Sequence, residues 1–275
     1  MTDQEARYDR IAEGYSACWS PIHRDRTLAL LDVIEPFVAA GARRILDVGC
    51  GTGALAAAAV ARWPAVHVTG VDASAGMLLV ADRELEPLPG SQRERIDLVQ
   101  ALADQLPFED GSFDVVTTAF VLQLVPSRFR AVREARRVLR PGGWIATLTW
   151  LAGGEAMAAD RVYDDVLEAR GFEPRGATPD ADEPESPGVA AARLRRAGFE
   201  QASASGDEVD HAFTPESFLA FLARFDDEDL FSTMDADTRT AVERELLARL
   251  RALPPGGLRL RLPIAYATAR RPRRP

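Results

Sequence analysis

Three glycines stand close together in the segment "ILDVGCGTG", residues 45–53, which begins with a short apolar run interrupted by one aspartate. The run is typical of a buried strand, and Asp47 falls near its end. Glycine permits positive φ angles and lets the backbone approach a ligand closely. Open parallel sheets bind ligands at the carboxyl ends of their strands. The segment therefore predicts a binding loop for a phosphate, a dinucleotide or another nucleoside.

Two acids narrow the choice of ligand. Gly49, Gly51 and Ala54 fit a relaxed GxGxxA dinucleotide pattern, but Asp47 would repel a pyrophosphate and would suit an ammonium group. A Walker-type phosphate loop is excluded, because no Gly-Lys-Ser/Thr sequence follows and the chain has no lysine. Asp72 ends the next apolar run, where a carboxylate can accept hydrogen bonds from both ribose hydroxyls. We predict a nucleoside that carries an amino group and no phosphate.

These residues need a sheet that brings several strand ends together. From residue 43 onward, short runs rich in β-branched residues alternate with longer stretches of helical period. The expected strands are "RRILDVGC", "VHVTGVDA", "IDLVQAL", "FDVVTTAF" and "GWIATLTW", and the expected helices are "ALAAAAVARW", "SAGMLLVADREL" and "SRFRAVREARRVL". This alternation predicts βαβ units and a parallel sheet covered on both faces. "RPGG" at 140–143 is expected to end the third helix.

The flanking regions read differently. Before residue 43 we expect two helices, at 3–18 and 24–40, separated by "WSPIHR". After Trp150 we expect, in order, a helix, a mobile Pro- and Asp-rich loop, a second helix, a strand, an amphipathic region and a final strand. Their approximate bounds are 155–170, 171–188, 188–197, 199–212, 215–252 and 258–270.

Composition excludes several classes of function. The net charge of −9 argues against a nucleic-acid surface. No apolar run approaches the roughly 18 residues of a membrane span, and the N-terminus lacks the features of a secretory signal, so we expect a cytoplasmic protein. Cys18 and Cys50 are expected to be reduced thiols. His23, His67 and His211 lie far apart in the sequence, so no metal site is expected.

Residues 43–150 resemble the class I S-adenosylmethionine-dependent methyltransferases. The resemblance is carried by "ILDVGCGTG", "GVDAS", "LPFEDGSFD" and "VLRPGGW", which occur in that order. "YDRIAEGYSACWSPIHR" near the N-terminus is similar to the ubiquinone and menaquinone C-methyltransferase group, whose helices cap the cofactor. The resemblance implies a Rossmann-like α/β fold: a seven-stranded, mostly parallel sheet with helices on both faces, an N-terminal helical cap and helical insertions in the C-terminal half.

The same resemblance divides the chain and assigns its cofactor site. Residues 1–42 would form the cap, 43–150 the core that binds S-adenosylmethionine, and 151–275 the rest of the same domain with insertions on the acceptor side. The cofactor's methionine part would lie at the glycine loop, its ribose at the second acid and its adenine beside the third strand. The implied residues are Asp47, Gly49, Cys50 and Gly51; Asp72, Ala73 and Met77; Leu102 and Ala103; and Ala119, whose carbonyl would face the ammonium group.

Leu102 departs from the family pattern. Relatives usually carry an acid there, which accepts a hydrogen bond from the adenine amino group. Losing one neutral hydrogen bond costs roughly 0.5 to 1.5 kcal/mol, so this change weakens binding without abolishing it. Asp104, two residues later, either substitutes for the missing acid or is a solvated loop residue.

Methyl transfer from a sulfonium is an in-line displacement, and it needs alignment in a dry site more than it needs a catalytic triad. A general base matters only if the acceptor must lose a proton, and the candidates are Tyr15, His23 and His211. Side chains on the acceptor side are expected from the N-terminal helices and from the fourth and fifth strands. These are Tyr8, Tyr15, Trp19, His23, Phe120, Gln123 and Trp150.

Acceptor specificity is expected to reside in residues 151–252, because loops and insertions vary function on a common scaffold. Within them, "FLAFLARF" at 218–225 either lines a pocket for an apolar substrate or is the buried face of a helix. The leading hypothesis is a methyltransferase that acts on the carbon or oxygen of a small organic molecule. The alternatives are a non-catalytic binding or regulatory module and a nicotinamide-dependent oxidoreductase.

Overall fold

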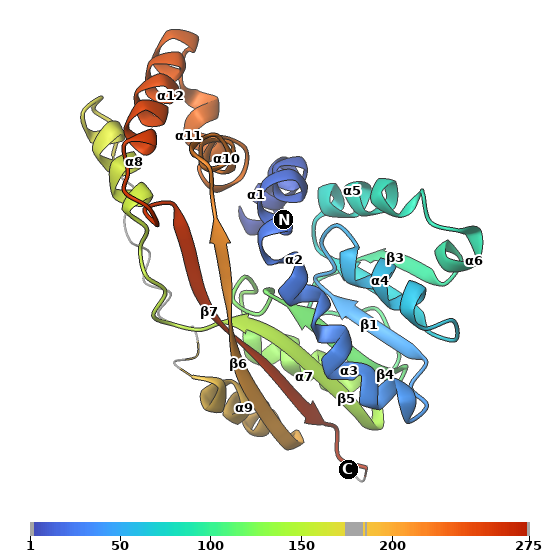
Figure 1. Ribbon diagram of the computed structural model, residues 1–275. Coiled ribbons are helices and arrows are strands. Elements are labelled where there is room, and N and C mark those ends of the chain that lie inside the picture. Colours follow the sequence, from blue (N-terminus) through green and yellow to red (C-terminus); the bar gives the residue numbers. More distant parts are fainter. Residues whose placement is uncertain (1–2, 174–183, 185, 274–275) are drawn as a thin grey trace.

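The computed structural model describes residues 3–173, 184 and 186–273. Its centre is a seven-stranded sheet in the order β3-β2-β1-β4-β5-β7-β6 (Figure 1). The first five strands of that order are mutually parallel, while β7 runs antiparallel to both β5 and β6. The strands are β1 Arg44–Val48, β2 His67–Asp72, β3 Ile96–Gln100, β4 Phe113–Ala119, β5 Leu139–Trp150, β6 Glu200–Ala212 and β7 Arg259–Arg270. The predicted Rossmann-like fold class is confirmed.

Helices cover both faces of this sheet, as the expected buried strands require. Side chains alternate along each strand, so Ile45 and Val115 contribute to one core while Leu46 and Val116 contribute to the other. Helices α3 and α4 pack on the first face, and α7 and α9 pack on the second. The helices beside the sheet are α3 Leu30–Ala39, α4 Ala54–Arg62, α5 Ala75–Leu85, the short α6 Gly90–Arg93, α7 Arg128–Val138 and α9 Pro187–Arg196.

The N-terminal region corrects one expectation, because "WSPIHR" does not separate two helices. Helix α1 (Asp3–Gly14) continues through a π-helical turn, η1 (Tyr15–Trp19), into α2 (Ser20–Leu28). Pro21 falls in the first turn of α2, directly after this π-helical turn. The π-helical turn therefore takes the place of the expected break.

A second correction concerns "RPGG". Helix α7 ends at Val138, and Leu139 already pairs with Phe113 of β4. The four residues lie within the irregular first part of β5, where the register with β4 shifts and Gly142 has a φ of +82°. Helix α7 thus ends one residue before the expected end at Leu139, and the strand begins at Leu139 instead of the expected Gly143.

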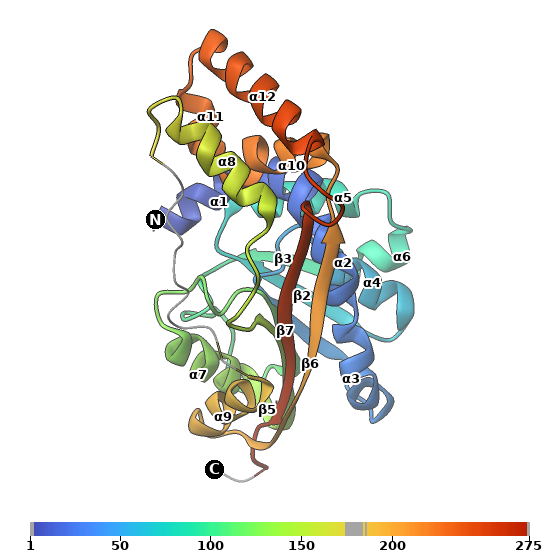
Figure 2. The same ribbon diagram turned by 60° about the vertical axis from the view of Figure 1, so that its left-hand side comes forward.

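The C-terminal half adds a helical layer beyond one end of the β6–β7 pair (Figures 1 and 2). It consists of α8 Ala158–Glu168, α10 Pro215–Phe221, the π-helical turn η2 Leu222–Asp226, α11 Glu228–Thr233 and α12 Ala236–Arg251. These helices share an apolar core that also includes Ile11 of α1. The Tyr163 hydroxyl donates a hydrogen bond of 2.6 Å to Asp227, which links α8 to the segment after η2.

The elements expected after Trp150 are present with small shifts in their ends. Most of the loop expected at 171–188 lies outside the described residues, which exclude 174–183 and 185. Within the described part of the chain, no helix is long and apolar enough to cross a membrane.

Candidate functional site

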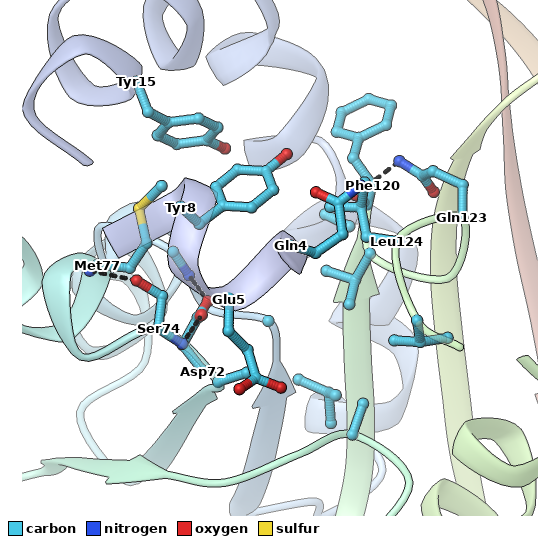
Figure 3. A pocket seen from close by; sticks show the side chains of 18 of the residues that line it. Gln4, Glu5, Tyr8, Tyr15, Asp72, Ser74, Met77, Phe120, Gln123 and Leu124 are labelled. Carbon is cyan, nitrogen blue, oxygen red and sulfur yellow. Dashed lines mark hydrogen bonds between the residues drawn. The ribbon is translucent and has the colours of Figure 1, made fainter. Parts of the chain in front are cut away.

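A cavity of about 400 Å³ lies at the carboxyl ends of β1, β2, β4 and β5, beneath α1. Figure 3 shows Tyr8 and Tyr15 of the N-terminal helices above Asp72 and Ser74, with Phe120 and Gln123 on another wall. The structure brings most of the predicted site residues to this cavity. Those that line it are Gly49, Gly51, Asp72, Ala73, Met77, Leu102, Ala103 and Ala119, together with Tyr8, Tyr15, Trp19, His23, Phe120, Gln123 and Trp150.

The glycine loop forms the floor of the cavity and needs its glycines. Gly49 has a φ of +70° and Gly51 a φ of +53°, a region that side chains rarely adopt. A Cβ on Gly49 would also lie 2.1 Å from a methyl group of Val121. The loop is tied to β2, because the Gly49 N–H donates to the Val71 carbonyl at 2.7 Å. The loop conformation is therefore fixed by contacts on both sides.

Asp72 stands at the rim of this floor. Its carboxylate accepts hydrogen bonds from the Gly51 N–H at 2.9 Å and from the Ser74 N–H at 3.0 Å. Burial nevertheless raises the pKa of Asp72 above the ordinary value for an aspartate. Each carboxylate oxygen can still accept a further hydrogen bond, as recognition of a ribose diol requires.

Asp47 lies deeper and does not line the main cavity. It is 3% exposed, and it borders a second, small cavity of about 30 Å³ that Gly49 and Ala119 also line. The Thr117 hydroxyl donates a hydrogen bond of 2.8 Å to its carboxylate. Burial raises the pKa of Asp47 to about 7. Cys50 borders the same small cavity, and burial raises the pKa of its thiol as well.

Asp9 of helix α1, which the sequence reasoning missed, binds the start of α5 beside the site. Asp9 accepts hydrogen bonds from the Ser74 hydroxyl at 2.6 Å and from the Gly76 N–H at 2.9 Å, at the start of α5. These bonds lower the pKa of Asp9. Gly76 permits the contact, since a Cβ there would lie 2.6 Å from the Asp9 carbonyl oxygen. No short-range pattern signals this role, because the two segments are far apart in the chain.

Aromatic rings form the remaining wall. Phe120 stacks on Trp150 with ring centroids 3.9 Å apart, and Trp19 stacks on Phe225 at 5.5 Å. Phe120 has a φ of +57°, an unusual conformation for a large residue and one that recurs at functional sites. Tyr15 lies edge-on to Phe225, with 5.8 Å between the ring centroids. The cavity therefore has the carboxylate of Asp72 on one side and aromatic rings on the other.

His23 sits among these rings as a neutral group. Burial lowers its pKa to about 4. Its Nδ1 lies 3.1 Å from the Thr27 hydroxyl oxygen, and its Nε2 lies 3.4 Å from the Tyr15 hydroxyl oxygen. Burial raises the pKa of Tyr15 well above the usual range, so this phenol is also neutral. The pair can exchange hydrogen bonds with a ligand without adding charge to the aromatic wall.

The two π-helical turns meet above the cavity. A Cβ on Gly14, just before η1, would lie 1.6 Å from the carbonyl oxygen of Arg224 in η2, so the two backbones touch. Arg7 of α1 donates to the Phe225 carbonyl at 3.2 Å, across the same junction. The cap and the C-terminal insertion thus form one roof over the site.

The segment "FLAFLARF" combines both roles proposed for it. Phe218 and Leu222 are fully buried in the core of the C-terminal helices, whereas Phe225 lines the cavity. Sequence reasoning identified the segment but not which of its residues reaches the site. From the segment after β4, sequence reasoning named Phe120 and Gln123 but missed four further residues that line the cavity, namely Val121, Leu124, Val125 and Pro126.

His211 does not reach the cavity. It lies on β6 with its ring 4.6 Å from that of Phe213, and it is absent from the residues that line either cavity. Leu102 does line the main cavity and is 37% exposed. Asp104 lines it too, and its carboxylate is 3.9 Å from the Arg130 guanidinium.

Comparison with known sequences identifies the core of the chain. Residues 46–147 match the family described as a methyltransferase domain. The chain is 39% identical over 145 residues to the ubiquinone/menaquinone biosynthesis C-methyltransferase UbiE of Methylobacterium nodulans, an alignment that covers 52% of this chain and 55% of the relative. The chain thus spans about half the length of the curated relatives it matches.

Solved structures extend the likeness to the whole fold. Phosphoethanolamine N-methyltransferase 2 of Haemonchus contortus, solved with phosphomonomethylethanolamine and S-adenosylhomocysteine, is 17% identical with a TM-score of 0.58, covering 99% of this chain and 61% of that one. The [4+2]-cyclase SpnF is 27% identical with a TM-score of 0.54, covering 90% of this chain and 81% of that one. The resemblance inferred from the sequence motifs is confirmed: this chain carries a methyltransferase domain at residues 46–147 on a Rossmann-like fold.

Proposed function

We propose that the protein is an S-adenosylmethionine-dependent methyltransferase that acts on a small organic acceptor. One observation carries the proposal: two carboxylates, the buried Asp47 and the half-buried Asp72, flank the glycine loop at the strand ends. A nucleoside with an amino group satisfies both acids, whereas a dinucleotide pyrophosphate would meet unfavourable negative charge. The donor set thus fits S-adenosylmethionine.

The other contacts follow from the cavity walls. Asp72 would bind the ribose, and Ala73 and Met77 would flank the adenine beside Ala103. The Ala119 carbonyl and Asp47 would face the ammonium group at the small cavity. These assignments come from the family resemblance, and the positions of the residues around the two cavities support them.

When bound, S-adenosylmethionine supplies an electrophilic methyl group on a sulfonium. The protein aligns the acceptor and keeps water out, which in-line transfer requires. Tyr15, Trp19, Phe120 and Phe225 would provide that dry surface around the acceptor. Neutral His23 and Tyr15 would orient a hydroxyl or amine of the acceptor by hydrogen bonding. Carbon or oxygen methylation of a small molecule with a flat apolar part fits this roof best.

The comparisons support this assignment. The relative from Methylobacterium nodulans is named for C-methylation in ubiquinone and menaquinone biosynthesis. The family match at residues 46–147 includes the glycines of the loop. An acceptor that carries an apolar ring is in keeping with that name and with the aromatic wall of the cavity.

The first test is calorimetric titration with S-adenosylhomocysteine. We expect micromolar binding that Asp72→Ala abolishes, while Asp97→Ala, at an exposed position on the neighbouring strand β3, leaves it unchanged. Labelled S-adenosylmethionine would then be incubated with a panel of small acceptors, and transfer of label to one of them is expected. Absence of any binding at millimolar ligand would contradict the proposal, and binding without transfer to any acceptor would favour a non-catalytic module.

A further inference from the structure

The carboxyl group of Asp47 has no compensating charge. It is 3% exposed, and its one side-chain partner is the neutral hydroxyl of Thr117. An ionised carboxylate that leaves water without a cationic partner carries a large energetic penalty. No cationic group of the described residues is among those that shift the pKa of Asp47. Burial without a cationic partner therefore favours the protonated form of this acid.

The groups that face Asp47 from neighbouring elements do not change this balance. Asp72 at the end of β2 is an acid and raises the pKa of Asp47 further. Cys50 and Tyr15 are both protonated, because burial raises the pKa of each. His23 of α2 is neutral, because burial lowers its pKa to about 4. Thr52 and Ser20 contribute hydroxyl groups to the wall of the small cavity.

One basic side chain, that of Arg24, borders the small cavity on its outer side. Arg24 is exposed to solvent, and it is not among the groups that shift the pKa of Asp47. Solvent screens such a guanidinium strongly. The carboxyl group therefore meets no effective positive charge before a ligand arrives.

We propose that Asp47 exchanges its proton for the ammonium group of the cofactor, so that the site binds the amino-acid end of the ligand and releases one proton. The small cavity of about 30 Å³ beside Asp47 and Ala119 is the place where that ammonium group would lie. This inference rests on the proposed function, since it takes S-adenosylmethionine and its product as ligands of the site.

The exchange has a clear physical cause. Burial, with a further contribution from the charge of Asp72, raises the pKa of Asp47 to about 7 despite the hydrogen bond from Thr117, so the carboxyl group is half protonated at neutral pH. An ammonium group within about 4 Å in a poorly solvated site favours the carboxylate strongly and lowers its pKa. Ligands without that ammonium group leave the proton in place. Asp47 thereby makes the site selective for the amino-acid end of the ligand, and it does so through its ionisation.

The test is calorimetric titration of the full chain with S-adenosylhomocysteine in pairs of buffers that differ in ionisation enthalpy. The slope of observed heat against buffer enthalpy gives the protons released. For a carboxyl group with a pKa near 7, we expect about 0.9 proton released at pH 6, about 0.5 at pH 7 and about 0.1 at pH 8. As the pH rises toward 7, the dissociation constant should fall about tenfold per pH unit. Above pH 7 it should level off.

Two controls separate this exchange from proton release elsewhere. Asp47→Asn keeps the acceptor for Thr117, and it should bind with no proton release and with an affinity that is independent of pH between 6 and 8. The nucleoside 5′-methylthioadenosine lacks the amino-acid end and should bind the wild-type protein without releasing a proton. Thermal unfolding of Asp47→Asn would establish that the variant is folded.

The outcomes distinguish the two proposals. If the wild-type protein binds S-adenosylhomocysteine and releases no proton at pH 6, the exchange is refuted while the cofactor site stands. The role of Asp47 would also be refuted if Asp47→Asn released as many protons as the wild-type protein on binding S-adenosylhomocysteine. The same holds if the wild-type protein released as many protons on binding 5′-methylthioadenosine. If neither compound binds at all, the proposed function itself fails.

Discussion

Leu102 is the residue at which this chain departs from the methyltransferase pattern. It lines the cavity beside Ala103 and is 37% exposed, so in the proposed cofactor site an apolar side chain would face the adenine amino group. Asp104 lies on the same wall but has Arg130 at 3.9 Å. A carboxylate beside a guanidinium is a weaker acceptor for a neutral amine than a free one. We therefore expect that the adenine amino group lacks a good acceptor in this protein.

Replacement of Leu102 by aspartate should restore that acceptor. We expect Leu102→Asp to tighten S-adenosylhomocysteine binding by a few-fold to tenfold, since one hydrogen bond contributes about 0.5 to 1.5 kcal/mol. Calorimetric titration measures the change, with Leu102→Ala as the control for loss of the leucine side chain. Equal affinity of Leu102→Asp and Leu102→Ala would show that the adenine amino group lies elsewhere.

The raised pKa of Asp47 should also make the stability of the ligand-free protein depend on pH. Its pKa is about 7 in the folded protein and about 3.8 in the unfolded chain, so the folded state holds the proton more tightly. This contribution to the unfolding free energy is present below pH 4 and is lost as the pH rises to 7, a change of roughly 4 kcal/mol at most.

Asp47→Asn should remove that dependence. Urea denaturation gives the free energy of unfolding of both proteins at pH 5 and at pH 8. The value for the variant minus the value for the wild-type protein should be larger at pH 8 than at pH 5. Every other titrating group is common to both proteins, so the difference between the two pH values isolates Asp47. An identical stability difference at both pH values would mean that Asp47 is ionised in the ligand-free fold.

At the scale of elements, two acids of helix α1, Asp9 and Glu13, join it to α5 beside the cavity. Asp9 contacts the start of α5 through Ser74 and Gly76, while Glu13 makes an exposed ion pair with Arg83 further along the same two helices. Buried or partly buried hydrogen bonds to a charged acceptor stabilise more than exposed ion pairs do. The two acids therefore make unequal contributions to the same packing.

Asp9→Ala should loosen the cap, and Glu13→Ala is its matched control. We expect the first change to weaken S-adenosylhomocysteine binding about tenfold and to speed amide hydrogen exchange in residues 3–14. Glu13→Ala should change the affinity for S-adenosylhomocysteine and the rate of hydrogen exchange by less than about threefold, because exposed ion pairs contribute little. If both variants behave alike, Asp9 does not hold α1 in place.

The elements that the sequence predicts well are those with strong local patterns. The glycine loop and Asp72 follow apolar strand runs, so their place at the sheet edge follows from strand order alone. The roles of Asp9 and Phe225 depend on contacts between segments more than 60 residues apart, which no local period encodes. The break expected at "WSPIHR" was wrong, because the π-helical turn η1 continues the helix up to the start of α2.

For the molecule as a whole, the site is assembled from three distant stretches of chain: the N-terminal cap, the strand ends and η2. A ligand present at a concentration 100 times its dissociation constant stabilises the folded protein by about 2.7 kcal/mol. S-adenosylhomocysteine should therefore raise the melting temperature and slow hydrogen exchange in all three stretches, as mass spectrometry can resolve. Protection confined to residues 45–53 and 72–77 would show that the roof closes independently of the ligand.

The backbone contact between Gly14 and Arg224 has a consequence for protein engineering. A chimera that takes its C-terminal insertion from a relative, in order to change the acceptor, would present a different surface to residues 14–19. Since no side chain separates the two backbones there, even a small shift of the new insertion would collide with the N-terminal helices or open a gap above the cavity. Exchanges of acceptor specificity should therefore move the first 28 residues and residues 215–233 together, as one transplant taken from a single donor.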